Sequence, residues 1–352
     1  MALLEVRDLS VEFDTEDGVV HAVGGISYTV EAGRSLGIVG ESGSGKSVSS
    51  QTILGLTRAA NARFSGEVLF EGRDLLTMSE QEMRAIRGED IAMIFQDPLS
   101  SLHPFHRVGD QLVEAVRTHH DVSKPAARDR ATEMLTLVGI PEPRARLDAY
   151  PHEFSGGMRQ RAMIAMALIN SPKLLIADEP TTALDVTVQA QILELIGRLQ
   201  EETGTAVILI THDLGVVAEM THDIAVMYAG RIVERATTGE LFASPQHPYT
   251  WGLLRSIPRL DSSRDEELVP IDGRPPSLIN LPSGCSFHPR CAFVRNAHRR
   301  VVPELEPVDG DPTHEVACLL NAQTRRGLWQ RLAAGEPPEQ ARATVPVEDA
   351  RT

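Results

Sequence analysis

The stretch Gly40-Glu41-Ser42-Gly43-Ser44-Gly45-Lys46-Ser47 decides how the rest of this sequence is interpreted. It has the form G-x-x-x-x-G-K-S, and it lies between the short apolar run 35–39 and a segment of helical character. Glycines in this pattern let backbone N–H groups converge on phosphates, while the lysine reaches the β- and γ-phosphates and the serine hydroxyl holds Mg²⁺. The alternative, a glycine-rich turn with a surface lysine, does not require the preceding strand. We therefore predict a nucleotide site formed by Gly40, Ser42, Gly43, Gly45, Lys46 and Ser47.

Strands and helices alternate around this motif. Apolar runs with the length of buried strands lie at 174–177, 207–210 and 224–227. Residues 127–138 and 188–199 instead place apolar side chains at helical spacing. This alternation predicts an α/β fold with a mostly parallel core sheet. Residues 3–6 and 11–13 favour strands of an antiparallel edge sheet.

Composition and charge exclude several classes of protein. The chain has 352 residues, enough for a large α/β core and a small further domain, and its formal net charge is −15. The 34 lysines and arginines are scattered, which argues against a nucleic-acid partner. Residues 1–10 lack the basic start of a signal peptide, and the longest apolar stretches, such as 206–210, are only as long as a strand. We therefore expect a cytoplasmic chain without a membrane-spanning segment.

A second group of motifs lies further along the chain. Phe154-Ser155-Gly156-Gly157-Met158-Arg159-Gln160 stands just before Lys173-Leu-Leu-Ile-Ala-Asp178-Glu179-Pro180. Ser155 begins a helix-like stretch that continues with Gly156 and Gly157, so its hydroxyl and the helix N-terminus can form a second phosphate site. Without this context, the same three residues would suit an ordinary helix cap equally well.

Two carboxylates close the apolar strand at 174–177. Asp178 is positioned for Mg²⁺, directly or through water, and Glu179 is the candidate general base that orients the attacking water. Acidic residues at strand ends are often merely exposed to solvent. The phosphate-binding motif earlier in the chain favours the catalytic interpretation here.

With these motifs in this order, residues 1–255 resemble the ATPase cassette of ABC transporters. The resemblance implies a P-loop ABC ATPase cassette with a helical subdomain at about 97–170 that contacts membrane subunits. It also implies that the two phosphate sites meet across a head-to-tail dimer. Phe154 and Met158 depart from the commonest signature, which has Leu and Gln there, but Ser155 and both glycines are kept.

The same resemblance assigns roles to further residues. Gln96 resembles the glutamine that senses the γ-phosphate and binds Mg²⁺ together with Ser47 and Asp178. His212 resembles the switch histidine at the γ-phosphate, and Asp185 ends a dimer-contact loop that begins at Thr181. Phe13 is the candidate for stacking on adenine, although a strand phenylalanine can equally serve packing alone. The predicted nucleotide contacts thus also include Phe13, Ser155, Gly156, Gly157 and Asp185.

Three later motifs narrow the subfamily. The stretches at 96–104, 247–250 and 284–291, which read QDPLSSLHP, HPYT and GCSFHPRC, are similar to those of oligopeptide/dipeptide permease ATP-binding subunits. This similarity implies an ATPase that powers import of di- or oligopeptides, with nickel, glutathione or small sugars as alternatives. The implied partners are a second ATPase, usually a paralogue, two membrane-spanning permease subunits and an extracytoplasmic binding protein, which places the chain at the cytoplasmic face of the membrane.

A non-transport ABC ATPase for DNA repair or translation is the alternative from another class, but the coiled-coil or zinc insertions usual there are missing.

The C-terminal part has a different composition. A linker near Asp261 leads into proline-rich sequence, so we predict a small loop-rich domain at 256–320 and a largely disordered tail at 321–352. The resembled subunits carry four cysteines in this region. This chain has Cys285, Cys291 and Cys318, with His298 at the position of the third cysteine as a possible fourth ligand. The hypotheses are a [4Fe–4S] cluster, a Cys₃His zinc site, or three free thiols.

Overall fold

An eight-stranded sheet forms the centre of the molecule. The computed structural model describes residues 2–97, 101–182, 185–256 and 270–344. The strand order is β11-β12-β10-β9-β3-β8-β7-β6. In chain order the strands are β3 (Ser35–Val39), β6 (Ile91–Ile94), β7 (Leu174–Asp178), β8 (Ala206–Thr211), β9 (Asp223–Tyr228), β10 (Arg231–Thr237), β11 (Glu306–Val308) and β12 (Asp311–Val316).

The strands at the functional end of this sheet are parallel. β9, β3, β8, β7 and β6 pair in parallel, whereas β10, β12 and β11 continue the sheet antiparallel. β3, β7 and β8 are buried along their whole length, which explains their uninterrupted apolar character. The carboxyl ends of these parallel strands share one edge of the sheet, and ligand sites of open α/β sheets form at that edge. The predicted α/β fold with a mostly parallel core is confirmed.

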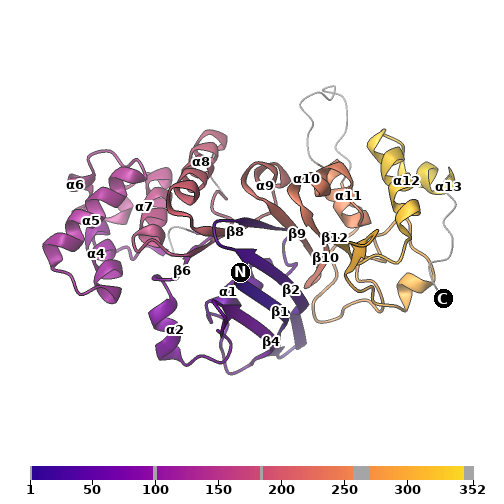
Figure 1. Ribbon diagram of the computed structural model, residues 1–352, viewed down its shortest axis with the longest axis horizontal. Helices are drawn as coiled ribbons and strands as arrows, with labels where there is room; N and C mark the ends of the chain where they lie inside the picture. The colour runs from indigo at the N-terminus through magenta and orange to yellow at the C-terminus, as the bar shows by residue number, and fades with distance from the viewer. Residues whose placement is uncertain (1, 98–100, 183–184, 257–269, 345–352) are drawn as a thin grey trace.

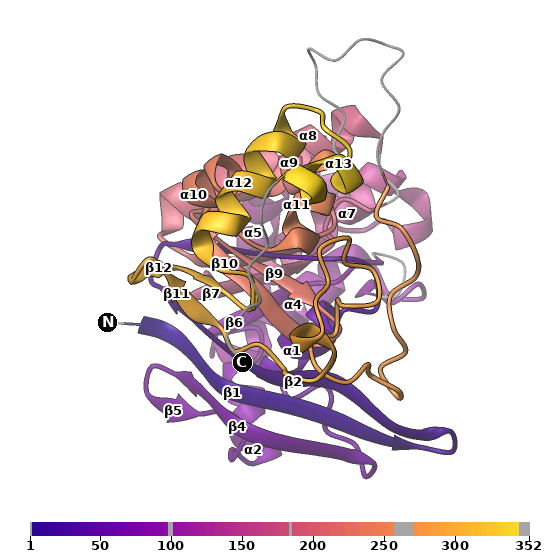
Figure 2. The ribbon, with the colours of Figure 1, turned by 90° about the vertical axis from the view of Figure 1, so that its right-hand side faces the viewer.

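A second, antiparallel sheet forms a separate layer, seen at the bottom of Figure 2. Its order is β2-β1-β4-β5, with β1 (Ala2–Thr15), β2 (Gly18–Glu31), β4 (Ala62–Phe70) and β5 (Arg73–Asp74). One core cluster joins Leu4 and Val11 of this sheet to Leu36 and Ile38 of β3. The two short predicted strands at 3–6 and 11–13 are parts of the single strand β1, whose pairing shifts register between Val6 and Leu9.

Helices cover the central sheet and form a subdomain at one end (Figure 1). Around the sheets lie α1 (Lys46–Ile53), α2 (Glu80–Ile86), α8 (Val186–Thr203), α9 (Leu214–Met220), α10 (Thr238–Ala243) and α11 (Pro248–Arg255). The subdomain contains α4 (Val108–His119), α5 (Lys124–Leu137), α6 (Pro143–Arg146) and α7 (Gly156–Leu168), with a short 3₁₀ turn at Pro151–Glu153. The predicted helices at 127–138 and 188–199 correspond to α5 and α8. In the described part of the chain, every helix is too short or too polar to cross a bilayer.

We refer to α11 and the chain beyond it, residues 248–256 and 270–344, as the C-terminal unit. It joins the central sheet through β12, which pairs with β10. The predicted linker around Asp261 lies outside the described residues. The rings of Tyr249 in α11 and Phe287 are 5.4 Å apart, so α11 packs against the later part of this unit.

The prediction of a largely disordered tail from residue 321 is wrong for most of that segment. Helices α12 (Ala322–Ala333) and α13 (Pro338–Thr344) occupy it, while residues 345–352 lie outside the described part. Leu328 and Leu332, one helical turn apart, are buried in a cluster with Trp251 and Phe293. The tail is rich in Ala, Arg and Glu, and its few apolar residues suffice for folding because their aromatic partners come from other segments.

Candidate active site

The loop after β3 has a shape that only glycine allows at two positions. The φ angles of Gly40 and Gly45 are 154° and 99°, in the region that side chains disfavour. A Cβ atom at Gly40 would lie 2.2 Å from the carbonyl oxygen of Met227, and one at Gly45 would lie 2.3 Å from that of Ala22. The loop therefore fits tightly against β9 and β2 and presents its backbone at the N-terminus of α1, where anions bind favourably.

Lys46 begins α1 and turns back into this loop. Its amino group donates hydrogen bonds to the carbonyl oxygens of Gly40 at 2.8 Å and Glu41 at 3.0 Å. Burial lowers the pKa of Lys46, and nearby carboxylates act in the opposite direction. A buried ammonium group that donates to carbonyl oxygens is suited to exchange them for phosphate oxygens. The geometry fits a bound nucleoside phosphate.

Next to Lys46, the side-chain oxygens of Ser47 and Asp178 lie close together. The Ser47 hydroxyl donates to Oδ1 of Asp178 at 3.0 Å, across 131 residues of sequence. Asp178 is buried at the end of β7, and burial raises its pKa while the Ser47 hydrogen bond opposes the shift. Carboxylate and hydroxyl oxygens are the ligands that Mg²⁺ prefers. These two residues could hold the ion as predicted.

Glu179 is the centre of a second group. Its Oε2 accepts hydrogen bonds from the Gln96 amide at 3.0 Å and the Thr182 hydroxyl at 2.8 Å, and Nδ1 of His212 lies 3.6 Å from Oε1. The backbone of Glu179 is left-handed, with φ of 46°, and its N–H donates to the carbonyl of Ile210 in β8 at 2.8 Å. The structure therefore brings all three predicted catalytic residues together at the carboxyl ends of neighbouring strands. In the structure the Gln96 amide binds Glu179. The role of Gln96 as a magnesium ligand stays a prediction.

The second predicted phosphate site lies on another part of the molecule. Ser155 caps α7, and its hydroxyl accepts a hydrogen bond from the N–H of Met158 at 3.3 Å. Ser155 and Gly156 are exposed, and a Cβ atom on Gly156 would have open space around it. α7 packs against α4, α5 and β6, whereas α1 packs against β1 and β2. Ser155 and Lys46 thus belong to different layers, and the open helix N-terminus can receive a group from another molecule.

The remaining predicted nucleotide contacts have structural roles as well. Asp185 caps α8 by accepting a hydrogen bond from the N–H of Val188 at 3.0 Å, and residues 183–184 just before it lie outside the described part. Phe13 is partly buried and packs against the core cluster that includes Val11. This contact favours the packing interpretation, and adenine stacking by Phe13 stays a prediction.

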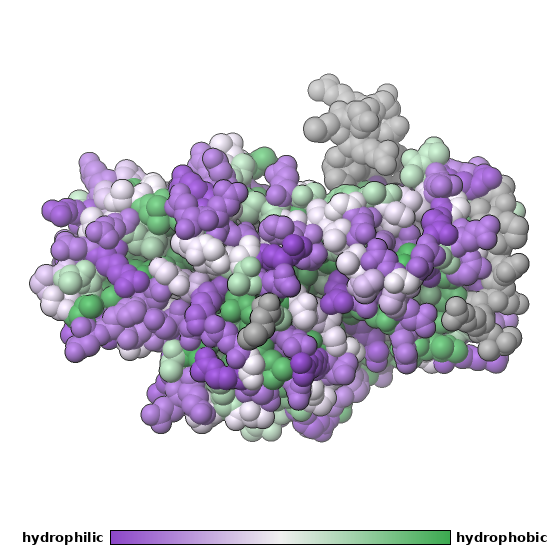
Figure 3. All heavy atoms as spheres, viewed as in Figure 1, coloured by the Kyte–Doolittle hydropathy of each residue, from purple (hydrophilic) through white to green (hydrophobic). Residues whose placement is uncertain are grey.

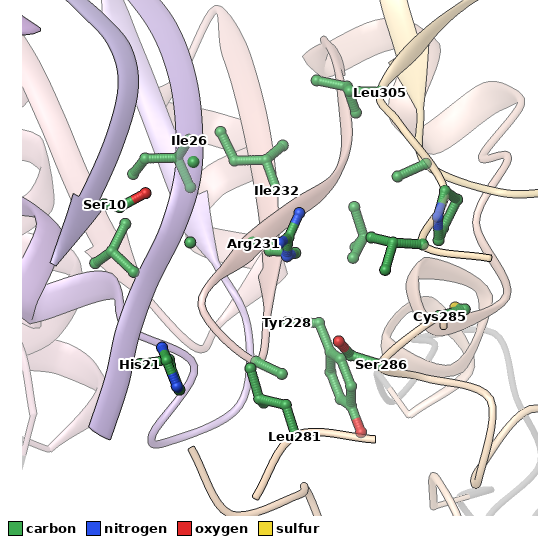
Figure 4. A pocket seen from close by; sticks show the side chains of 18 of the residues that line it. Ser10, His21, Ile26, Tyr228, Arg231, Ile232, Leu281, Cys285, Ser286 and Leu305 are labelled. Carbon is green, nitrogen blue, oxygen red and sulfur yellow. The ribbon is translucent and has the colours of Figure 1, made fainter. Parts of the chain in front are cut away.

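A sizeable cavity lies away from this site. It measures about 1100 Å³ and lies between the antiparallel sheet and the C-terminal unit (Figure 4). Figure 4 shows Ser10 and His21 on the sheet side and Leu281, Ser286 and Leu305 on the other side. None of the residues predicted to bind ATP lines this cavity. This cavity is therefore separate from the predicted ATP site.

The structure does not support the predicted metal cluster. Cys285, Cys291 and Cys318 are free, and burial raises the pKa of each thiol, to about 12 for Cys318. Nδ1 of His298 accepts a hydrogen bond from the backbone N–H of Arg295 at 3.1 Å. Over residues 2–97, 101–182, 185–256 and 270–344, no three His, Cys, Asp or Glu side chains are grouped to hold a metal ion.

Several contacts around the site could not be predicted from the sequence. Thr182 binds Glu179, and the buried amide of Gln160 in α7 donates to the carbonyl of Pro180, the residue after Glu179. The side chain of Glu41 pairs with Arg290 of the C-terminal unit. Gln160 and Arg290 stand within quoted motifs, but nothing in their local sequence names a partner so far along the chain.

Comparison with known proteins agrees with this geometry. Residues 23–182 match the family of ABC transporters, and residues 233–297 match the family described as the C-terminal region of oligopeptide/dipeptide transporters. The oligopeptide transport ATP-binding protein OppD of Bacillus subtilis is 52% identical over 97% of this chain and 94% of its own length. The dipeptide transport ATP-binding protein DppD of the same organism is 54% identical over 91% and 95%.

The chain belongs to the oligopeptide/dipeptide branch of ABC transporter ATP-binding proteins. Among solved structures, a dimeric post-hydrolysis state of the ATP-binding cassette MJ0796, bound to ADP and Pi, has a TM-score of 0.61 and 26% identity. It covers 67% of this chain and 98% of that one. This ABC ATPase therefore has the cassette fold, binds ATP with Mg²⁺ and hydrolyses it.

Proposed function

We propose that this ABC ATPase hydrolyses ATP to power the import of di- or oligopeptides through a membrane transporter. The observation that carries the proposal is the joining of Gln96, Glu179 and His212 beside the loop of Lys46, in a chain whose relatives are named peptide transport proteins. A nickel or other small-solute importer is the alternative within the same branch. Substrate selection would fall to the other subunits.

In this proposal each group of the site has its own task. Lys46 and the backbone of the loop bind the phosphates, and Ser47 and Asp178 hold Mg²⁺, which when bound neutralises phosphate charge. Glu179 accepts the proton of the attacking water as general base, and its contacts to Gln96 and His212 orient it. His212 is exposed enough, at 66% of its side chain, to reach the γ-phosphate.

We further infer that ATP is held between two ATPase subunits. Ser155 and the open N-terminus of α7 lie apart from Lys46 of the same chain, so they are available to the nucleotide of a partner. The cassette MJ0796 is described as dimeric, which supports this arrangement. The partner is a paralogue in this proposal.

The permease subunits would dock between the core sheet and the helical subdomain. A groove of about 350 Å³ lies there, lined by residues that include Leu54, Leu56, Phe95, Met163 and Met166. Leu56 and Phe95 are exposed at 47% and 37%, and apolar side chains in an open groove favour a protein partner. The face drawn in Figure 3 is mostly hydrophilic, with small hydrophobic areas. Docking in this groove would place the chain peripherally at the cytoplasmic face of the membrane.

The four-iron cluster and the zinc site are not part of this proposal. In the described residues of the C-terminal unit, no three potential ligands are grouped to hold a metal ion, so the structure gives neither site support. The C-terminal unit instead contributes contacts between protein segments.

Purification of the assembled complex tests the proposed function. The chain, tagged and extracted from membranes in mild detergent, should bring with it two permease subunits and a second ATPase. Its ATP hydrolysis should rise several-fold when the extracytoplasmic binding protein is added with peptide, and not when that protein is empty. Stimulation by a nickel-loaded or sugar-loaded protein alone would reject the peptide substrate, and a chain without permease partners would reject transport.

A further inference from the structure

Glu41, the second residue of the phosphate-binding loop, connects this loop to the C-terminal unit. Its carboxylate accepts two hydrogen bonds from the Arg290 guanidinium, at 2.5 Å from Nη1 and 3.0 Å from Nη2. The two residues are 249 positions apart in sequence. The Arg290 side chain is only 4% exposed, and a paired, buried guanidinium fixes its partner's position.

Arg290 is itself held in place from several sides. Its Nε donates to the carbonyl of Asp272 at 2.8 Å, and its Nη2 donates to the carbonyl of Ile271 at 3.1 Å. The guanidinium carbon lies 5.8 Å from the ring centre of Tyr228 and 5.9 Å from that of Phe287. These contacts leave the guanidinium one orientation, toward Glu41.

The backbone of Glu41 has a second partner in the C-terminal unit. Its N–H donates to the hydroxyl of Tyr249 at 2.7 Å, and Tyr249 is fully buried in α11. The carbonyl of Glu41, in turn, accepts one of the hydrogen bonds of Lys46. One loop residue therefore links the phosphate-binding lysine to both Tyr249 and Arg290.

We propose that Arg290 and Tyr249 are positioning residues for the phosphate-binding loop, so that the C-terminal unit sets how tightly the loop holds ATP. This inference rests on the proposed function, since it concerns the affinity of the same ATP site. If the loop already has its ATP-binding conformation, ATP binding costs less free energy for ordering the loop. Release of Glu41 lets the loop and Lys46 move, and the affinity for ATP falls.

Titration of the full-length chain with a fluorescent ATP analogue and Mg²⁺ tests this inference. Glu41→Gln and Arg290→Met should each raise the Kd by about tenfold, and Tyr249→Phe, which keeps the packing, by a smaller factor. The double variant Glu41→Gln/Arg290→Met should bind no more weakly than the weaker single variant, because both changes break one contact. Arg290→Lys keeps the positive charge but cannot donate the two parallel hydrogen bonds of a guanidinium. Its Kd should therefore lie between those of wild type and Arg290→Met.

Arg235→Met is the matched control. Arg235 in β10 pairs with Glu315 in β12 at 2.5 Å, so this change also loosens the C-terminal unit but leaves the loop alone. Its Kd should stay within twofold of wild type. Unchanged Kd values for Glu41→Gln and Tyr249→Phe would overturn the inference, as would equal weakening by Arg235→Met or multiplicative weakening in the double variant. If the wild-type chain binds no ATP, that result rejects the proposed function itself, not only this inference.

Discussion

Glu179 receives contacts from three side chains that arise at different points of the chain. Gln96 follows β6, Thr182 follows β7, and His212 follows β8. The carboxylate is only 17% exposed, so these contacts fix its orientation. Its proposed role depends on charge, because an amide of the same shape cannot accept a proton from water.

Replacement of Glu179 by Gln therefore separates ATP binding from hydrolysis. We expect the Kd for ATP to stay within a few-fold of wild type, while the hydrolysis rate of the assembled complex falls by about 10²- to 10⁴-fold. Phosphate release and nucleotide titration measure the two quantities. Glu201→Gln, an exposed change of the same kind in α8, should leave both unchanged. A Glu179→Gln complex that hydrolyses ATP at a near-normal rate would remove this residue from the role of base.

Much of the site at this scale could be predicted from the sequence. Lys46 and Ser47 begin the helix that follows β3, Asp178 ends β7, and the carboxyl ends of parallel strands lie at one edge of the sheet. The pair of Glu41 and Arg290 could not be predicted, because its members lie 249 positions apart and each looks like an ordinary surface charge. Phe13 has a pattern that suits packing and stacking alike.

Among the helices and strands, α12 could not be predicted from the pattern of its own sequence. The segments that became α5 and α8 show helical periodicity by themselves, and these helices formed where predicted. α12 has few apolar side chains in a polar segment, and its packing depends on contacts of Leu328 and Leu332 with Trp251 and Phe293. Such tertiary contacts are not visible in the composition of one segment.

Leu328→Ala should consequently lower the stability of the protein. Leu328 is fully buried, and removal of a buried leucine side chain leaves a cavity that costs about 2–5 kcal/mol. The unfolding midpoint in urea or on heating measures the loss. Gln330→Ala, at an exposed position of the same helix, should change the free energy of unfolding by less than about 0.5 kcal/mol. Equal midpoints for Leu328→Ala and wild type would show that α12 does not pack as described.

At the scale of the whole molecule, the C-terminal unit is built onto the core sheet. β12 extends the sheet beyond β10, and the fully buried carboxylate of Glu234 in β10 lies 2.8 Å from Nε2 of His314 in β12. The same carboxylate accepts hydrogen bonds from the backbone N–H groups of Gln246 and His247. The proline-rich composition predicts a separate C-terminal segment but not these contacts, which attach the segment to β10 at the edge of the parallel strands.

Transport by reconstituted vesicles tests the central claim most directly. The complex in lipid vesicles, with ATP on the side of this chain and the binding protein on the other, should move a labelled peptide across the bilayer. We expect wild-type vesicles to transport the peptide only with ATP and Mg²⁺, and vesicles with Glu179→Gln to bind ATP without transport. Equal peptide transport by the wild-type and Glu179→Gln complexes, or transport without ATP, would contradict the claim that hydrolysis at this site powers peptide import.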